Sequence, residues 1–495
     1  MKTKTLSLVL APVLAFVSLL IICFAFLPIA KAVVPAPDGG YPNFTTAEGQ
    51  KALFSLTSGA ANTAVGWFSL FSDATGSFNT ATGAGSLLFN TADANTAFGA
   101  AGLLFNTTGI NNTAVGAAAL SNNTIAEENT ATGAFALSSN TEGDFNTANG
   151  AWALYFNSIG ERNTAIGDSA LYQNSNGNRN TAVGNAALVV NTEGNDNTAI
   201  GVGALRFNTL GHQNTATGAQ ALSSNTTGTV NTATGYQALA SNTDGTSNTA
   251  TGVDALADNT TGGGNTATGF DALLHNDTGD YNTAIGLFAL GNVTTGTNNT
   301  GLGRSAGTSV TTADHVICIG ANVSGANVSN SCYIGEIFGV TSSGGTAVFI
   351  NNSGKLGTST SSRRFKEEIK PMDKSSEAVL ALKPVTFRYK KEVDSDGIPQ
   401  FGLIAEDVEK VNPDLVLRDK EGKPYTVRYD QVNAMLLNEF LKEHRKNEQQ
   451  ESKIEKQEAR IMRQEKQIEA LTAGFQKVSA QLEANKTAPQ VVANP

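Results

Sequence analysis

The sequence Asn62-Thr-Ala-Val-Gly66 opens a phrase, Asn-Thr-Ala-x-Gly, that recurs through the middle of the chain. Fifteen copies begin between Asn62 and Asn299, and they are spaced by 17 residues except for one interval of 16. A leucine follows eight residues after the starting Asn in every copy but the last, and a second Asn stands at offset eleven in twelve copies. Self-similarity at a fixed period is typical of a stacked repeat fold.

A unit of 17 residues is too short for a pair of helices and suits one coil of a β-solenoid, with two short strands and two turns. Gly and Asn supply turn conformations with positive φ. One coil cannot cover its own leucine, so the next coil must cover it, and stacked Asn side chains would form an amide ladder. We therefore predict a mainly β protein with a β-solenoid or β-roll, about 70 Å long at about 4.8 Å per coil. A disordered Asn/Thr/Gly-rich linker is the alternative, but it does not explain a leucine held in register fourteen times.

The first 32 residues have the features of an export signal. Lys2 and Lys4 precede an apolar run over residues 6–30, and the run ends at Ala30-Lys31-Ala32. This pattern predicts a signal peptide cleaved after Ala32. The run is also long enough for a transmembrane helix that stays as an anchor, which is the alternative. Either way the rest of the chain is secreted or displayed at the cell surface.

Charge and cysteine usage exclude several classes of function. Of the 33 Lys and Arg residues, 24 lie in the last 135 residues, so the repeat has no basic surface for nucleic acid. Cys318 and Cys332 lie in similar segments fourteen residues apart, which allows either a disulfide or two buried thiols. The chain has no Cys-x-x-Cys pair and only four scattered histidines, so we expect no metal and no cofactor.

The composition changes abruptly near residue 360, after which charged residues become dense. A small α+β domain is expected there, followed by a long helix that Asp430 can cap. Apolar residues on this helix recur every seven residues, which predicts a coiled coil. Ile at one core position with few leucines at the other favours more than two strands, and we expect a trimer. The alternative is a single solvated helix. The heptad positions are Phe440, Asn447, Ile454, Ile461, Ile468, Phe475 and Leu482, with Gln457, Gln464, Leu471 and Val478 three residues after four of them.

These observations give the following predicted organisation of the chain. It comprises a signal peptide or anchor (1–32), a lead-in or cap segment (33–61), the repeat solenoid (62–303), the solenoid end and linker (304–360), the small α+β domain (361–436), the coiled coil (437–486) and a disordered tail (487–495).

Five segments of the C-terminal region resemble the peptidase S74 family. They are Ser361-Ser-Arg-Arg-Phe-Lys-Glu-Glu-Ile369, Leu382-Lys-Pro-Val-Thr-Phe-Arg-Tyr389, Phe401-Gly-Leu-Ile-Ala-Glu-Asp-Val408, Asn412-Pro-Asp-Leu-Val416 and Tyr429 to Leu437. The resemblance covers about residues 355–450. This family is the intramolecular chaperone domain at the C-terminus of phage endosialidases and tail fibres. It implies a domain that forms a homotrimer, templates folding of the upstream fibre and can then cut itself off.

The resemblance also implies the site of autocleavage. Ser361 would be the nucleophile, Lys366 the activating partner, and the cut would fall between Ser361 and Ser362. A lysine can activate a hydroxyl when burial or nearby cations lower its pKa, and Arg363 and Arg364 lie close in sequence. The family usually has Asp where this chain has Ser362. The alternative is a retained assembly domain whose Ser361 and Lys366 are ordinary surface residues.

Three classes of function fit this organisation to different degrees. The first is a structural surface fibre with a self-assembly domain. The second is an adhesin that binds surface glycans or proteins, since the repeat loosely resembles the heads of trimeric autotransporter adhesins; its candidate contacts are Trp67, Phe68, Trp152, Tyr155 and Phe156. The third is a glycan-degrading spike, which the absence of a recurring carboxylate pair disfavours.

Overall fold

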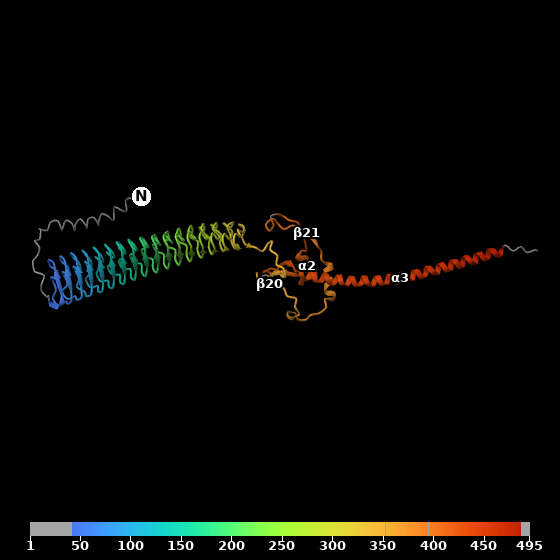
Figure 1. The fold of residues 1–495 in the computed structure, drawn as a ribbon, viewed down its shortest axis with the longest axis horizontal. Helices are drawn as coiled ribbons and strands as arrows, with labels where there is room; N and C mark the ends of the chain where they lie inside the picture. Colours follow the sequence, from blue (N-terminus) through green and yellow to red (C-terminus); the bar gives the residue numbers. More distant parts are fainter. Residues whose placement is uncertain (1–41, 352, 395, 487–495) are drawn as a thin grey trace, which may run out of the picture. The chain divides into compact units, whose positions relative to one another are not determined.

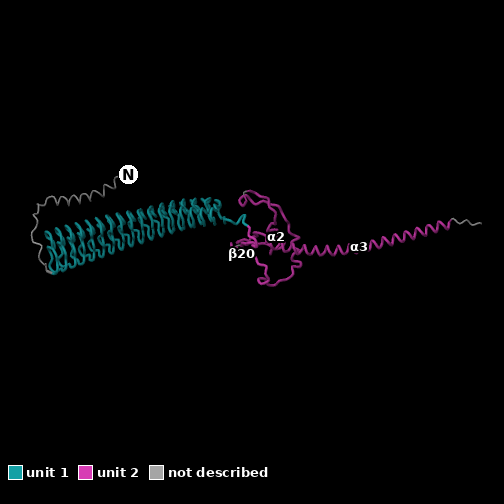
Figure 2. The backbone as a smooth tube through the Cα atoms, viewed as in Figure 1, with its two compact units in different colours: residues 1–340 teal, residues 341–495 magenta. Residues whose placement is uncertain are grey.

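The computed structural model describes residues 42–351, 353–394 and 396–486. They form two compact units that meet after Val340 (Figures 1 and 2). The predicted signal peptide or anchor, and the tail at 487–495, lie outside the described residues. Among the residues that are described, no helix is both long and apolar enough to cross a membrane.

The first unit is a β-solenoid in which each coil contributes one strand of three residues, after a short 3-10 helix η1 (Pro42–Phe44). Each strand pairs in parallel with the strand of the next coil, in register, so that Thr198, Ala199 and Ile200 lie opposite Thr215, Ala216 and Thr217. The strands are β1 (Thr46–Glu48), β2 (Thr63–Val65), β3 (Thr80–Thr82), β4 (Thr96–Phe98), β5 (Thr113–Val115), β6 (Thr130–Thr132), β7 (Thr147–Asn149), β8 (Thr164–Ile166), β9 (Thr181–Val183), β10 (Thr198–Ile200), β11 (Thr215–Thr217), β12 (Thr232–Thr234), β13 (Thr249–Thr251), β14 (Thr266–Thr268), β15 (Thr283–Ile285), β16 (Thr300–Leu302), β17 (Ile317–Ile319) and β18 (Cys332–Ile334).

The solenoid fold is confirmed, but the expected second strand of each coil is absent from the described coils. The rest of the coil is built from turns, because residues at two nearby offsets take positive φ: Ala186 has φ 55° and Leu188 has φ 50°. Such a conformation costs a residue with a Cβ roughly 1–2 kcal/mol. Contacts between coils offset this cost, since Ala186 N donates to Asp168 O at 3.0 Å and Leu188 N donates to Ala204 O at 3.0 Å.

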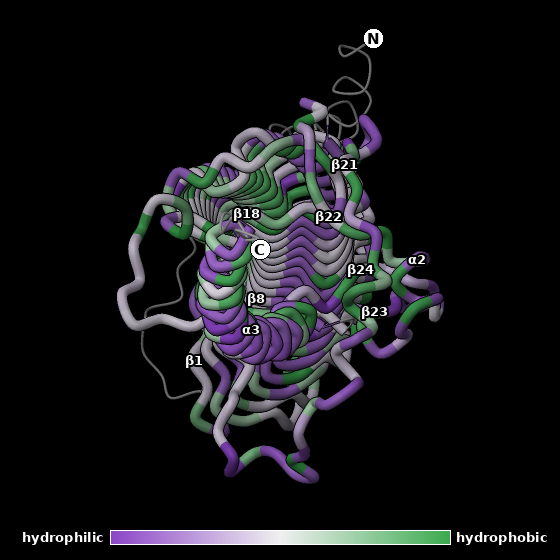
Figure 3. Tube along the Cα trace, turned by 90° about the vertical axis from the view of Figure 1, so that its right-hand side faces the viewer, coloured by the Kyte–Doolittle hydropathy of each residue, from purple (hydrophilic) through white to green (hydrophobic). Residues whose placement is uncertain are grey.

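The core lies inside a single chain. The strand alanines and the repeat leucines from Leu70 to Leu290 have no exposed surface. They form one continuous hydrophobic cluster along the solenoid. Figure 3 shows residues of like hydropathy following one another from coil to coil. The leucine column is therefore an intrachain core, and each chain closes its own solenoid.

Two ladders of buried Asn hold successive coils together. In the first ladder, Asn180 N donates to Asn163 Oδ1 at 2.9 Å, while Asn180 Nδ2 donates to Gly194 O at 2.8 Å. In the second, Asn191 Nδ2 donates to Asn174 Oδ1 at 2.7 Å and also to Gly194 O at 3.0 Å. Throughout the described part of the chain, every buried side-chain nitrogen or oxygen has a hydrogen-bond partner. These hydrogen bonds fix how successive coils align with one another, while the leucines fill the core.

The second Asn ladder starts with an aspartate. Asp73 is fully buried at the position that Asn occupies in the next twelve coils, and its carboxylate accepts from Gly76 N at 2.7 Å and Asn79 Nδ2 at 3.1 Å. Burial raises the pKa of Asp73 in spite of these bonds. The folded state therefore favours the protonated carboxyl. This contribution to stability is complete below the unfolded pKa and is lost as the pH rises through the folded pKa.

Replacing Asp73 by Asn is expected to stabilise the solenoid at pH 7 by on the order of 1 kcal/mol, because it removes a buried charge and extends the ladder. The gain should shrink toward pH 3, where Asp73 is already neutral. Thermal unfolding of both proteins at the two pH values measures the difference. Equal stabilities at pH 7 would contradict the account.

The second unit combines three small hairpins, short helices and one long helix. Its core consists of Val379, Val408, Leu415, Val416, Val427, Val432 and Met435. The paired strands are β19 (Val348–Ile350) with β20 (Leu356–Thr358), β21 (Val385–Phe387) with β22 (Gln400–Gly402), and β23 (Val416–Arg418) with β24 (Pro424–Val427). The helices are η2 (Arg363–Phe365), η3 (Asp373–Ala381), α2 (Ala405–Val411), η4 (Pro413–Leu415) and α3 (Tyr429–Lys486).

Within the described residues, Cys318 is a buried free thiol and Cys332 an exposed one. Strand β17 pairs with β18 so that Cys318 lies opposite Tyr333 and Cys332 lies opposite Ile317. Because side chains alternate across a strand, this offset of one residue puts the two cysteines on opposite faces. Burial, and then the nearby Cys332, raises the pKa of the Cys318 thiol. The disulfide is not formed, and the register disfavours it.

Candidate processing site

Ser361 lies in the exposed connection between β20 and the single turn of helix η2. The neighbouring Ser362 is half-buried and caps η2. Its Oγ accepts from the backbone N of Arg364 and from Arg364 Nε, both at 3.4 Å, and its carbonyl accepts from Phe365 N at 3.0 Å. The bond between Ser361 and Ser362 therefore lies at the boundary between an extended segment and a capped turn.

Lys366 ends the same turn on the other side. Its backbone N donates to Arg363 O at 3.2 Å, and its side chain is exposed. In the described chain no hydrogen bond joins Ser361 to Lys366, so the single chain does not assemble the predicted pair. The Lys366 side chain is exposed, so the burial that helps a lysine to act as a base is missing in the single chain. Another surface would have to cover Lys366 to supply this burial.

A buried polar cluster that the sequence analysis missed joins η3 to the long helix. Ser376 is fully buried, and its hydroxyl donates to Glu439 Oε1 and accepts from Asn438 Nδ2 at 2.7 Å. Lys442 Nζ lies 2.6 Å from Glu439 Oε1 and 3.3 Å from Ser376 Oγ. Lys442 and then Ser376 lower the pKa of Glu439. The spacing of Glu439 and Lys442 on one helix can be read from the sequence. Their contact with Ser376, more than sixty residues upstream, cannot.

The long helix α3 confirms the predicted helical segment and leaves its heptad side chains uncovered. These side chains are 51–76% exposed in the single chain: Phe440, Ile454, Ile461, Ile468, Leu471, Phe475, Val478 and Leu482. An apolar stripe of this length on an isolated helix indicates a surface for association.

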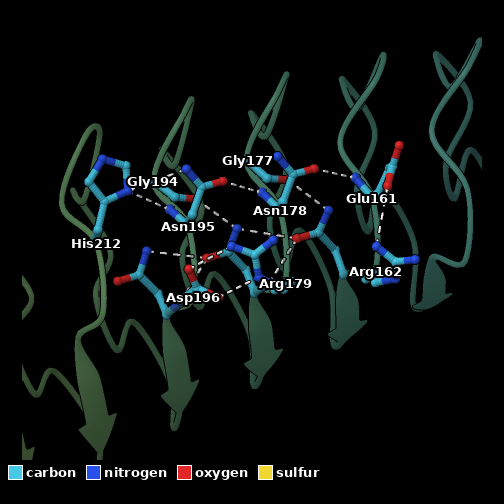
Figure 4. A network of polar contacts seen from close by, with 12 residues as sticks. Glu161, Arg162, Gly177, Asn178, Arg179, Gly194, Asn195, Asp196 and His212 are labelled. Atoms are coloured by element: carbon cyan, nitrogen blue, oxygen red, sulfur yellow. Dashed lines mark hydrogen bonds and ion pairs between the residues drawn. The ribbon is translucent and has the colours of Figure 1, made fainter.

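The outer turns of the solenoid carry polar chains and aromatic clusters. Figure 4 shows one polar chain, in which Asn178 N donates to Asn195 Oδ1 at 2.7 Å and Asn195 N donates to His212 Nδ1 at 2.9 Å. Beside it Arg179 binds Asp196 through two hydrogen bonds of 2.6 and 2.9 Å, and these bonds lower the pKa of Asp196. These contacts link neighbouring coils and satisfy most of the polar groups they join.

The aromatic residues singled out from the sequence fall into two groups on the solenoid. Trp67 and Phe68 lie 4.4 Å apart between ring centroids. In the second group, Trp152 lies 5.0 Å from Tyr155, and Tyr155 and Phe156 are 4.6 Å apart. Phe135 and Tyr172 extend the second group by stacking on Trp152 and Tyr155. The rings thus pack with one another along one chain.

Comparison with known proteins finds a family match over the segment that contains the candidate processing site. Residues 361–417 match the peptidase S74 family, described as chaperone of endosialidase. The match starts at Ser361 and runs through η2, η3, the β21–β22 hairpin, α2 and η4 into β23, a minor part of the chain. It confirms the resemblance seen in the sequence. Neither the curated proteins nor the solved structures gave a match. A β-solenoid joined to a segment similar to this family fits a fibre-like protein with a chaperone domain near its C-terminus.

Proposed function

We propose that the chain is an exported, fibrous surface protein whose C-terminal unit brings three copies together. The observation that carries this proposal is the exposed apolar stripe on α3. Burying one Ile, Leu or Phe side chain contributes about 1.5–3 kcal/mol. Eight such side chains per chain therefore provide on the order of 10–20 kcal/mol, which is enough to offset the cost of association. Ile at one core position with few leucines at the other favours more than two strands, and we propose three.

Assembly at one end would solve a folding problem that the solenoid creates. Every coil presents the same Asn, Ala and Leu contacts, so a coil can pair with the wrong neighbour at little energetic cost. Parallel pairing of distant segments is also slow to nucleate. A trimeric helix at the C-terminus would hold three chain ends side by side and define the coil from which each solenoid grows.

Sedimentation of the full-length chain tests the assembly proposal directly. A trimer is expected at micromolar concentration. A monomer at that concentration would overturn the proposal, because the stripe on α3 would then be solvated.

We further propose that the assembled chain is cut between Ser361 and Ser362. Support comes from the start of the family match at Ser361 and from the position of this bond in an exposed connection. Trimerisation would cover the connection and supply the burial that Lys366 lacks in the single chain. Cleavage would then release the fibre from its chaperone after assembly.

The cleavage proposal predicts a defined product. Purified wild-type protein should give a C-terminal fragment that begins at Ser362, identified by mass spectrometry. Lys366→Met should remain at full length because it removes the base. Lys370→Met is the matched control, since Lys370 pairs with Glu368 at 3.8 Å and has no assigned role. Wild-type protein that stays intact on a denaturing gel after assembly would refute cleavage.

An adhesin is the second candidate function, and the aromatic group around Trp152 favours it. Partly exposed rings such as Trp152, which stacks on Phe135, and Tyr155, which stacks on Tyr172, offer flat surfaces of the kind that sugar rings contact. Binding of the full-length protein to a glycan array, with Trp152→Ala for comparison, separates an adhesin from a purely structural fibre.

A further inference from the structure

We propose that the outer face of strands β11 to β14 binds ice. Side chains alternate across a strand, so the first and third residues of each strand face outward while the alanine between them is buried. In these four strands every outward residue is a threonine, and none of the eight is buried. This threonine face has two columns, which consist of Thr215, Thr232, Thr249 and Thr266, and of Thr217, Thr234, Thr251 and Thr268.

The strand pairing arranges these hydroxyls as a regular net. Thr215 lies opposite Thr232 and Thr217 lies opposite Thr234, and the same register continues to β14. Neighbouring parallel strands are about 4.8 Å apart, and residues two apart on one strand are separated by about 6.6 Å. Oxygen atoms on the prism faces of hexagonal ice repeat at similar distances in two perpendicular directions. Several hydroxyls of the threonine face can therefore join one lattice plane at once.

The hydroxyls of the threonine face are not used to hold the solenoid together. Threonines in the turns behave differently, since Thr192 Oγ1 donates to Thr209 O and Thr209 Oγ1 donates to Thr226 O, both at 3.1 Å. Within the described residues, no hydrogen bond joins the eight hydroxyls of the threonine face to another protein group. Each hydroxyl keeps one donor and two acceptor positions for water.

The threonine face is also rigid. Threonine is branched at Cβ, which restricts rotation about χ1. The coils beneath are joined by both Asn ladders, in which Asn231 N donates to Asn214 Oδ1 at 3.0 Å and Asn242 Nδ2 donates to Asn225 Oδ1 at 2.8 Å. A surface that is ordered before it binds loses little conformational entropy on binding. This favours contact with a lattice that is itself fixed.

The charge of the bordering residues agrees with an uncharged ligand. The residue before the starting Asn is charged in three earlier coils, as Arg162, Arg179 and Asp196. In the four coils of the threonine face, that position and the one after the Gly hold only uncharged residues, namely Gln213, Val230, Ser247 and Gly264, and Ala219, Tyr236, Val253 and Phe270. Such a border gives no attraction to nucleic acid or anionic lipid, which bind through basic residues. Ice is uncharged and needs only hydroxyls in register.

Freezing of solutions of the full-length protein tests the inference. The wild type should lower the freezing point of a seeded solution below its melting point and should change the shape of the growing crystals. Thr234→Phe combined with Thr251→Phe should lose most of this gap, because two projecting rings hold the lattice away from the remaining hydroxyls. Phe98 already occupies the equivalent position of β4, opposite Thr82, so the fold accepts this residue.

The matched control places two phenylalanines elsewhere on the same coils. Gln220 and Gln237 are equivalent residues of successive turns, and Gln237 Nε2 donates to Gln220 Oε1 at 3.0 Å. Phe135 and Phe288 stand at this position in other coils. Gln220→Phe with Gln237→Phe should therefore fold and keep the gap between freezing and melting points. Circular dichroism should give the same spectrum for both variants and the wild type.

Three outcomes would overturn the inference. The first is wild-type protein that neither lowers the freezing point nor partitions into slowly growing ice. The second is equal activity of the wild type and the threonine variant, which would place ice binding on another surface. The third is a threonine variant that sediments as a smaller species than the wild type, because a second copy of the chain would then cover the threonine face. None of these outcomes depends on cleavage at Ser361.

Discussion

A chain in which Ile454, Ile461 and Ile468 are all replaced by Asp is expected to sediment as a monomer, whereas the wild type is expected to sediment as a trimer. These side chains are 51–61% exposed in the single chain, so the substitutions leave the isolated helix largely unaffected. In a trimer they would place three charged layers in the core of the coiled coil. Each layer would lose the burial of three isoleucines, at about 1.5–3 kcal/mol each, and gain unpaired buried charge.

The matched control carries the same number of aspartates on the outer face of the helix. Ala459, Lys466 and Ala473 lie five residues after the three isoleucines and thus outside the predicted core. Their replacement by Asp should leave the trimer intact. A core variant that still sediments as a trimer would show that association depends on another surface of the C-terminal unit.

Gly201→Ala is expected to destabilise the solenoid by several kcal/mol, comparable to the largest effects of single substitutions. Gly201 has φ 137°, a conformation that residues with a Cβ rarely adopt, and an added Cβ would lie 2.5 Å from Gly218 O in the next coil. The coils cannot separate to relieve this contact without breaking the hydrogen bonds of the strands and of both Asn ladders. Equilibrium unfolding in guanidinium chloride measures the loss.

Gly203, two residues along the same coil, provides an internal control. Its φ is 64°, and the nearest atom to an added Cβ is Arg206 Cδ at 3.9 Å. Neighbouring coils already have Ala186 and Gln220 at the equivalent position with φ 55° and 58°. Gly203→Ala should therefore cost only the roughly 1–2 kcal/mol of the left-handed conformation, clearly less than Gly201→Ala. Equal losses for the two variants would mean that glycine content, rather than close approach between coils, limits stability.

The solenoid fold could be predicted because residues that stack on one another in successive coils recur at a fixed spacing in the sequence. A leucine and two Asn residues held at fixed offsets required buried columns, and the structure places Leu188, Asn180 and Asn191 in them. The path between these points was not predictable. Local sequence does not favour positive φ at Leu188. The hydrogen bond from its N to Ala204 O, which joins two coils, helps to offset the energetic cost of that conformation.

The end of the solenoid and the candidate site show the same limit. Similar segments around Cys318 and Cys332 suggested equivalent positions, but the last coil is shorter, and Cys332 pairs with Ile317 instead. At the candidate cleavage site, the change in composition near residue 360 located the domain boundary, but the turn that Ser362 caps was not predicted. The cluster of Ser376 with Glu439 and Lys442 depended on contacts between distant segments, which carry no periodic or local signature.

Because the Asn ladders repeat the same hydrogen bonds from coil to coil, the number of coils can change without changing the stability of each coil. Asn180 meets Asn163 through the same bond by which Asn197 meets Asn180, at 2.9 and 3.0 Å. Removing residues 180–196 from the gene would bring Asn197 against Asn163 with every donor and acceptor matched. Unequal crossing-over between repeats can thus lengthen or shorten the protein by whole coils, and natural selection can adjust the length of the solenoid without changing either end.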